Sequence, residues 1–262
     1  MLSPRTLRTN AAGIEQNILH VGHYLQKKGV GVDIYCTAKN PLGKITYEGL
    51  TLHEFPAFAP HESYFYSHSL FNALRSFDGE IIHCNGFNNL VSAAGVLSKK
   101  QNQKLIITMN SSGASTAFRR LLHQPLLWFY QHYQKKFDKI IFVSKWEYDH
   151  FRKHFNLPEN TFAIIPNGID ANEFKKVNAK KQKHMILSVG RLVKNKGMHR
   201  LIHAMPLLLQ PFPQTQLHIV GEGKEKAHLE KLAQTLNVSH AVIFHGNMGF
   251  NERKKLLQLF KQ

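Results

Sequence analysis

The residues with the clearest chemical potential lie in a short loop at residues 190–197, GRLVKNKG. An apolar run at 185–189 precedes the loop, and apolar residues with helical spacing follow it over 198–205. This pattern predicts a strand that enters a helix through a loop carrying Arg191 and Lys196. Because a helix N-terminus presents free N–H groups and a positive dipole end, two cations there indicate a phosphate ligand. An ordinary strand–helix turn with solvated cations is the alternative.

The charge of the chain favours the same kind of ligand. Residues 175–221 contain nine Lys or Arg and no Asp or Glu, and the formal net charge of the whole chain is +17. Phosphorylated ligands, anionic membranes and nucleic acid are the partners that such a charge selects. Nucleic acid ranks last, because the sequence has neither a Cys/His zinc spacing nor an aromatic RNA-binding signature.

Composition and patterning indicate a cytoplasmic protein with packed cores. Hydrophobic residues make up 43% of the 262 residues, which is ample for burial. Cys36 and Cys84 lie in or beside apolar runs and are too few for a disulfide framework, so we expect reduced thiols. No apolar run approaches the roughly 20 residues needed to span a bilayer. The N-terminus lacks the continuous apolar core of an export signal.

Strands and helices alternate along the chain. We expect strands at 30–36, 80–84, 104–109, 138–143, 161–166, 185–189, 216–220 and 241–244, with helices between them and a last helix at 253–260. In the helix at 88–100, we expect Leu90, Ala94 and Leu97 to face inward. Such alternation predicts βαβ units and parallel sheets, hence an α/β fold. The lysine-rich stretch 175–184 is typical of an interdomain linker.

The loop GRLVKNKG resembles the donor-phosphate loop of the retaining GT-B glycosyltransferases in the glycosyl transferase group 1 family. Other landmarks of that family follow in order: Ala12-Gly13-Ile14-Glu15 where the family has Gly-Gly-x-Glu, then 107–112, 167–174 and Gly221-Glu222-Gly223. The resemblance implies two Rossmann-like domains of the GT-B type, the second incomplete. It places an acceptor-side domain at 1–174, a linker at 175–184 and a partial nucleotide-sugar domain at 185–262.

The resemblance also implies a reaction. A sugar would move from a nucleoside-diphosphate sugar to a hydroxyl of a polysaccharide, lipopolysaccharide or lipid-linked glycan, with retention of configuration. The implied substrate-binding residues are Gly13, Arg191, Lys196, Gly221 and Glu222. The sequence shows no metal-binding spacing of His, Asp or Glu. Since the family uses its cationic loop in place of a metal, we expect no cofactor besides the donor substrate.

Two further residues are candidates for catalysis. Asn110 stands where the family usually has a His near the reacting sugar, and an amide cannot accept a proton as an imidazole can, although it can still bind a hydroxyl. Ser111 and Ser112 could add hydroxyl contacts or start the next helix. His83 lies at the carboxyl end of a predicted strand and is the second candidate, although a structural role is the more common one for a histidine.

Three departures from the family pattern predict a fragment that is inactive alone. Residues 1–10 do not resemble the family's first strand, the family's Glu-x7-Glu motif would come after residue 262, and Asn110 replaces His. An incomplete second sheet would leave an apolar face uncovered. The second reading is therefore a nucleotide-sugar-binding module without turnover.

A basic amphipathic stretch at 118–130 offers a second surface. Residues 81–137 contain seven Lys or Arg and no Asp or Glu, and large apolar side chains alternate with the cations at 118–130. Such a helix can lie at the interface of an anionic membrane, or it can pack its apolar side into the core. We expect core packing, with Pro125 interrupting the helix. Peripheral contact with the inner face of a membrane is the alternative.

Overall fold

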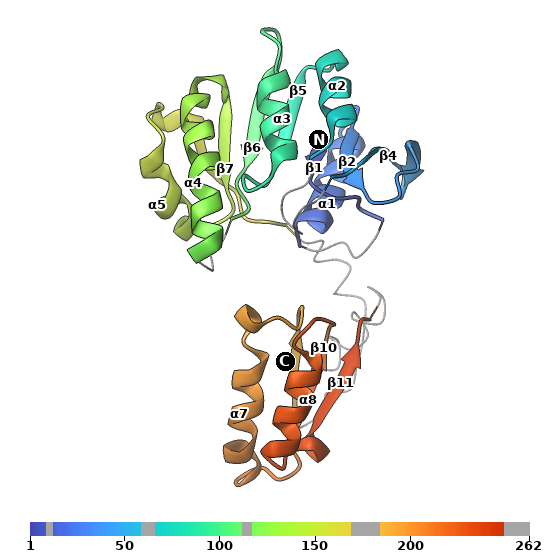
Figure 1. Ribbon diagram of the computed structural model, residues 1–262, viewed down its shortest axis with the longest axis vertical. Helices are drawn as coiled ribbons and strands as arrows, with labels where there is room; N and C mark the ends of the chain where they lie inside the picture. Colours follow the sequence, from blue (N-terminus) through green and yellow to red (C-terminus); the bar gives the residue numbers. More distant parts are fainter. Residues whose placement is uncertain (9–12, 59–65, 112–116, 169–183, 249–262) are drawn as a thin grey trace. The chain divides into compact units, whose positions relative to one another are not determined.

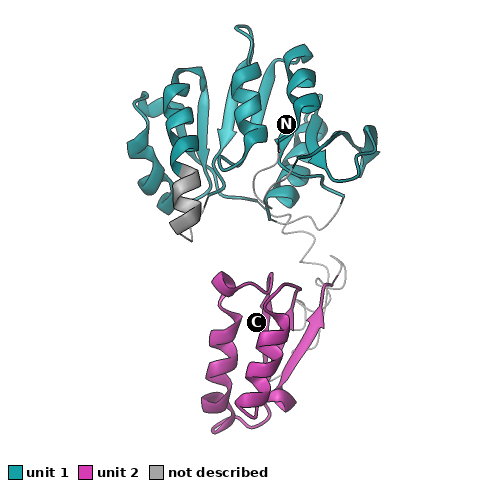
Figure 2. Ribbon diagram, in the orientation of Figure 1, with its two compact units in different colours: residues 1–169 teal, residues 170–262 magenta. Residues whose placement is uncertain are grey.

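The computed structural model describes residues 1–8, 13–58, 66–111, 117–168 and 184–248, with the side chains of 117–123 left out. The chain divides into two compact units, Met1–Ile169 and Asp170–Gln262 (Figure 2). Of the predicted linker at 175–184, only the last residue is among those described, and the predicted helix at 253–260 lies outside them.

The first unit is built on an eight-stranded sheet in the order β3-β4-β2-β1-β5-β6-β7-β8 (Figure 1). Its strands are β1 (Leu2–Ser3), β2 (Asp33–Ala38), β3 (Lys44–Tyr47), β4 (Leu50–Pro56), β5 (Ile81–Asn85), β6 (Lys104–Thr108), β7 (Lys139–Phe142) and β8 (Phe162–Ile164). Only β3 runs antiparallel to its neighbour. The helices are α1 (Gly13–Lys27), α2 (His68–Ser76), α3 (Leu90–Ser98), α4 (Ala117–His132) and α5 (Lys145–Phe151).

Two apolar cores hold this unit together. One joins α1 to β2 and β4 through residues such as Ile18, Ile34 and Leu52. The larger core lies between the sheet and the helices α2 to α5, and includes Phe87 and Tyr130. Because α1 and the other helices bury different residues of the same sheet, the unit is a three-layer α/β arrangement of the doubly wound kind.

The expectation that the first strand is missing is wrong. Leu2–Ser3 forms β1 at the centre of the sheet, parallel to both β2 and β5. Leu2 is only 2% exposed, and its carbonyl accepts a hydrogen bond of 3.1 Å from the Asn85 side chain. A strand of two residues has no alternation to detect, which is why the sequence pattern does not reveal it. Its place between β2 and β5 creates the reversal of strand order at which ligands of such sheets bind.

Two further expectations about helices need correction. Leu97, expected to face inward, is 45% exposed, because it lies in the last turn of α3 and lines an open cavity. Pro125 does not interrupt its helix, since α4 continues through it to His132. The predicted core packing of this helix is confirmed for its second half, where Leu126 and Tyr130 are buried.

The second unit has a parallel sheet in the order β11-β10-β9 among the described residues. Its elements are β9 (Met185–Val189), α7 (Met198–Leu209), β10 (Gln216–Val220), α8 (Lys226–Thr235) and β11 (Val242–Gly246). Both helices pack on one side of the sheet around Ile202, Leu217 and Leu229. The bounds of β9 and β10 agree with those predicted. The expected uncovered apolar face stays a prediction, because residues 249–262 lie outside the described part.

Along the described parts of the chain, no helix combines the length and apolar character that crossing a membrane requires.

Candidate functional site

The loop between β9 and α7 has the geometry of an anion site. After Arg191 and Leu192, residues Lys194–Lys196 form a single 3-10 turn. The turn ends at Gly197, whose φ of 75° is the left-handed conformation that glycine adopts readily. Gly197 is also the N-cap of α7, and no side chain of the described residues caps that helix. The first N–H groups of the 12-residue helix α7 therefore remain available to a ligand.

The cations of this loop are uncommitted. Arg191, Lys194 and Lys196 are all exposed. Within the described residues, none of their side chains makes a hydrogen bond or an ion pair. Because no carboxylate of the described residues pairs with them, their charge adds to the positive end of α7 at the same edge of the sheet. This arrangement can bind a phosphate or diphosphate.

Glycines bring the neighbouring loop against this one. The N–H of Leu192 donates to the Glu222 carbonyl at 2.9 Å, and the N–H of Glu225 donates to the Leu192 carbonyl at 3.0 Å. A Cβ atom at Gly221 would lie 2.0 Å from the Gly190 carbonyl oxygen, and one at Gly223 would lie 2.2 Å from that of Leu192. Only glycine allows this close approach of two backbones. The structure thus places the predicted Gly221 beside the cationic loop.

The role of Glu222 differs from that of its neighbours. Its carboxylate forms an ion pair of 2.9 Å with Lys226, four residues on in the same chain segment. Both side chains are partly exposed. Of the predicted substrate-binding residues in the second unit, Arg191, Lys196, Gly221 and Glu222 therefore lie on two adjoining loops at the carboxyl edge of the sheet. Gly223 completes the contact and was not among those predicted.

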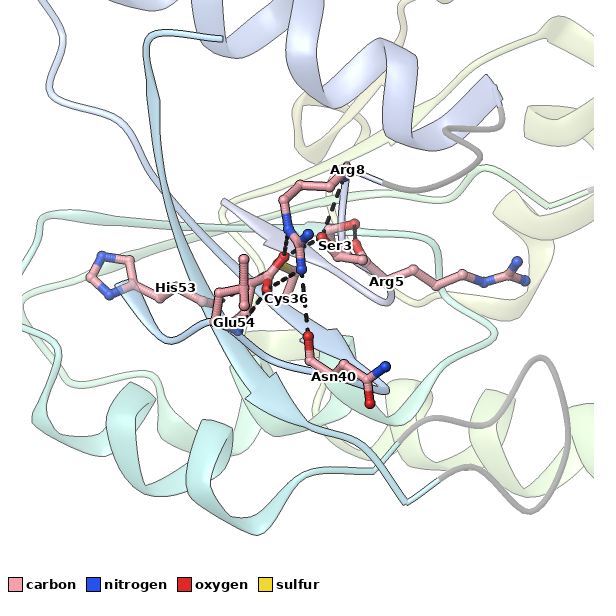
Figure 3. Close-up of polar contacts among 9 residues, drawn as sticks. Ser3, Arg5, Arg8, Cys36, Asn40, His53 and Glu54 are labelled. Carbon is pink, nitrogen blue, oxygen red and sulfur yellow. Dashed lines mark hydrogen bonds and ion pairs between the residues drawn. The ribbon is translucent and has the colours of Figure 1, made fainter. Parts of the chain in front are cut away.

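In the first unit, a buried carboxylate connects chain segments at the carboxyl edge of that unit's own sheet (Figure 3). The side chain of Glu54, near the end of β4, is fully buried. Arg8 donates to it from Nε and Nη2, both at 2.8 Å, and the Leu42 N–H donates at 3.0 Å. The Thr6 hydroxyl donates as well. Together these bonds fasten the segment after β1 across the ends of neighbouring strands.

The ionisation of Glu54 follows from these contacts. Burial acts to raise the pKa of this carboxyl group, but the hydrogen bonds from Arg8, Thr6 and Leu42 outweigh it and hold the pKa below its ordinary value. Glu54 is therefore ionised at neutral pH. No sequence pattern predicts this cluster, since Arg8 and Glu54 are 46 residues apart.

The predicted Gly13 stands at the start of α1, where it is exposed. A Cβ atom there would meet nothing within 4 Å, so no packing requirement explains this glycine. Residues 9–12, which would complete its loop, lie outside the described part.

Asn110 lies two residues after the end of β6 with a φ of 48°, a left-handed conformation that asparagine tolerates better than most residues. Its Oδ1 accepts a hydrogen bond of 3.3 Å from Asn167. The next residue, Ser111, accepts a hydrogen bond of 2.9 Å at its hydroxyl from the Asn88 side chain. Two buried amide atoms, Nδ2 of Asn110 and Oδ1 of Asn88, have no partner among the described residues. Since buried polar groups nearly always have one, these atoms indicate a ligand or water.

A second buried carboxylate holds the backbone next to Asn110. Glu147 accepts hydrogen bonds from the N–H groups of Ser111 at 2.5 Å and Val143 at 2.6 Å. The Ser144 side chain caps α5 by accepting from the Glu147 N–H at 3.1 Å. Burial raises the pKa of Glu147, and the two backbone donors act against that rise. These bonds fix the end of β6 and thereby the position of Asn110.

His83, the other catalytic candidate, lies within the sheet two residues before the end of β5. Its Nε2 is 2.8 Å from the Thr108 hydroxyl oxygen. Burial lowers the pKa of His83 to about 4, so the ring is neutral at pH 7. The structure gives it no hydrogen bond to Asn110. Among the described residues, no group of three His, Cys, Asp or Glu side chains is placed to hold a metal ion.

Two protein-family models match the chain. The one described as Glycosyltransferase Family 4 matches residues 11–173, and the one described as Glycosyl transferases group 1 matches residues 170–261. An uncharacterized glycosyltransferase of Methanocaldococcus jannaschii is 36% identical over 131 residues, which cover 45% of this chain and 33% of that protein.

A second relative carries a more specific name. It is the GDP-mannose-dependent monoacylated alpha-(1-6)-phosphatidylinositol monomannoside mannosyltransferase of Corynebacterium glutamicum, 30% identical over 127 residues. The match covers 44% of this chain and 32% of that protein. The chain therefore spans about a third of the length of these two curated relatives.

Solved structures show the same fold. WaaG, a glycosyltransferase involved in lipopolysaccharide biosynthesis, matches 98% of this chain and 71% of its own with a TM-score of 0.65 and 16% identity. A second structure is described as trehalose-6-phosphate from Escherichia coli bound with UDP-2-fluoro glucose. The match covers 98% of this chain and 75% of that chain, with a TM-score of 0.64 and 14% identity. The predicted α/β fold of the GT-B type is thereby confirmed.

Proposed function

Because this chain belongs to Glycosyltransferase Family 4, whose model matches residues 11–173, we propose that it transfers a sugar from a nucleoside-diphosphate sugar to an acceptor hydroxyl with retention. One observation carries the donor assignment: the uncommitted cations Arg191 and Lys196 lie at the uncapped N-terminus of α7. Charge develops on the diphosphate as it leaves, and preorganised cations and N–H groups stabilise that charge. In this proposal the cationic loop does the work of a metal ion, and no cofactor is required.

The acceptor hydroxyl would bind in the first unit, at the amides that follow β5 and β6. A hydroxyl group can donate to Oδ1 of Asn88 and accept from Nδ2 of Asn110, the two buried amide atoms that lack a partner among the described residues. Support for a glycan acceptor comes from the mannosyltransferase relative and from WaaG, whose names refer to a glycolipid and to lipopolysaccharide. A cytoplasmic location with peripheral membrane contact stays a prediction.

A nucleotide-sugar-binding module without turnover is the second candidate. The observation that favours it is the amide of Asn110, which occupies the position of a residue able to take a proton in the family that this sequence resembles. An amide has no such capacity at neutral pH. In that case the cationic loop would retain its ligand while no sugar is transferred.

The test follows the nucleoside diphosphate that the 262-residue chain releases from candidate donors, with and without glycan or glycolipid acceptors. The sequence predicts that this chain is inactive alone, but β1, one of the three features expected to be absent, is present. The proposal therefore expects acceptor-dependent release from this chain. We expect Asn110→Gly to raise the KM for the acceptor roughly 3- to 10-fold, the value of one neutral hydrogen bond. Glycine keeps the left-handed backbone of this position without strain, so the variant removes only the amide.

Asn237→Gly is the matched control, because Asn237 is also left-handed, with a φ of 55°, but is exposed in the second unit. Its KM should equal that of the unmodified chain. If a donor bound but no pair of donor and acceptor released nucleoside diphosphate, that result would favour the binding module. An unchanged acceptor KM in Asn110→Gly would refute the acceptor assignment.

A further inference from the structure

The first unit contains an apolar cavity that none of the polar sites uses. Its volume is about 500 Å³, and α2, α3 and α4 form its walls together with Tyr66, just before α2. Small-molecule sites occupy about 300–1,000 Å³, and this cavity has a size in that range. It opens to solvent beside Leu97, which is 45% exposed, so a ligand can enter it.

The walls fix the chemistry of the occupant. Phe71, Leu97, Leu126 and Phe129 line the cavity, and the lining contains no charged side chain. Small residues, among them Ala94, leave the space open on the side of α3. A polar or charged group placed there would lose its hydration without gaining a partner, so the cavity selects a hydrocarbon.

Positive charge surrounds the end of the cavity near Leu97. Lys136 donates from Nζ to the carbonyl of Val96 at 3.0 Å, one residue before Leu97, and retains two further N–H donors. Lys99 follows α3 and makes no side-chain hydrogen bond with another described residue. Its charge acts on Asp138, but that carboxylate forms its ion pair with Lys104. Residues 81–137, which supply α3 and α4, contain no Asp or Glu. A phosphate or carboxylate would therefore be favoured beside the hydrocarbon site.

From this combination we infer that the cavity binds the hydrocarbon chain of an anionic lipid, with its acidic head group at Lys99 and Lys136. Apolar walls hold one chain, and the excess of positive charge selects the charge of the head group, since residues 78–139 contain eight Lys or Arg against three Asp or Glu. The inference does not depend on sugar transfer. Lipid binding can be present or absent whether or not the donor loop functions.

The chain provides its own reporter. Trp128 lies in α4 directly before the cavity residue Phe129 and is 66% exposed. The chain has two Trp residues, so Trp146→Phe leaves Trp128 as the single reporter. We expect lysophosphatidic acid with a brominated chain, added below its micelle concentration, to quench the fluorescence of Trp128 in a saturable manner. Lysophosphatidylcholine with the same chain should bind at least 10-fold more weakly, and glycerol phosphate should not bind.

Leu97→Asp places a carboxylate in the wall and should weaken this binding at least 10-fold. Because Leu97 is 45% exposed, the variant should fold, which its thermal transition verifies. Leu207→Asp is the control, since Leu207 is 70% exposed in the second unit, and it should bind like the parent. Equal affinity of Leu97→Asp and the parent would overturn the inference. Binding of lysophosphatidylcholine as tight as that of lysophosphatidic acid would also overturn it. Equally tight binding of glycerol phosphate would overturn it as well, because it would indicate a phosphate site without a hydrocarbon site.

Discussion

Arg191→Ala and Lys196→Ala are each expected to weaken the binding of a nucleoside-diphosphate sugar by roughly 10- to 100-fold. A charge-assisted hydrogen bond to a phosphate contributes about 1.5–3 kcal/mol, and each 1.4 kcal/mol corresponds to a factor of ten. Both side chains are exposed and make no hydrogen bond or ion pair with another described residue, so their removal disturbs no contact within that part of the chain. The measurement is calorimetric titration at one fixed ionic strength, because phosphate contacts weaken with salt.

Lys231→Ala is the matched control for these two variants. Lys231 is an exposed cation in α8 of the same unit, so its loss changes the net charge equally without touching the loop. Its affinity should differ from that of the parent by less than about 2-fold, since surface charges contribute little at a distance. If Lys231→Ala weakened binding as much as the loop variants, the effect would be one of overall charge, and the assignment of the loop would be wrong.

Glu54→Ala is expected to lower the free energy of unfolding by about 3 kcal/mol, the low end of what the loss of one partner from a buried ion pair costs. The low end applies because the Arg8 side chain is 25% exposed and can turn partly toward water. The variant also leaves the Thr6 hydroxyl and the Leu42 N–H without their acceptor. Urea-induced unfolding, followed by circular dichroism, measures the change.

The contribution of Glu54 should also depend on pH. Its pKa is lower in the folded state than in the unfolded chain, where it is about 4.3. The stabilisation is therefore fully present above about pH 4.3 and is lost as the pH falls through the lowered value. In Glu54→Gln, the free energy of unfolding should fall less steeply as the pH is lowered. Glu80→Ala, which removes an exposed carboxylate, is the control and should leave both the free energy of unfolding and its dependence on pH nearly unchanged. A Glu54→Ala variant as stable as the parent would show that the cluster does not hold the segment after β1.

Local patterns predicted the elements that carry clear local signals. The bounds of β9 and β10 agree with the structure, because each strand is an apolar run that ends at a glycine-containing loop. Strand β1 escaped detection, since its two residues owe their place to pairing with β2 and β5 and not to their own pattern.

The same distinction holds at the candidate site. Arg191 and Lys196 were predicted, because their loop is a contiguous motif. Gly223 was noticed only as part of the motif with Gly221, and the reason for both glycines, the close approach of the Gly190 and Leu192 carbonyls, appears in the structure alone. Glu54 was missed, because its partner Arg8 is remote in sequence. Contacts of this kind are properties of the folded chain and leave no local trace.

The most direct test of the donor site is an amide NMR titration of the chain with UDP and with GDP, each compared with its nucleoside. We predict saturable shifts of the backbone signals of Gly190, Met198 and His199 with the diphosphates and no such shifts with uridine or guanosine, because the diphosphate binds the N-terminus of α7. Saturable binding of a diphosphate that leaves these three signals unmoved would contradict the account.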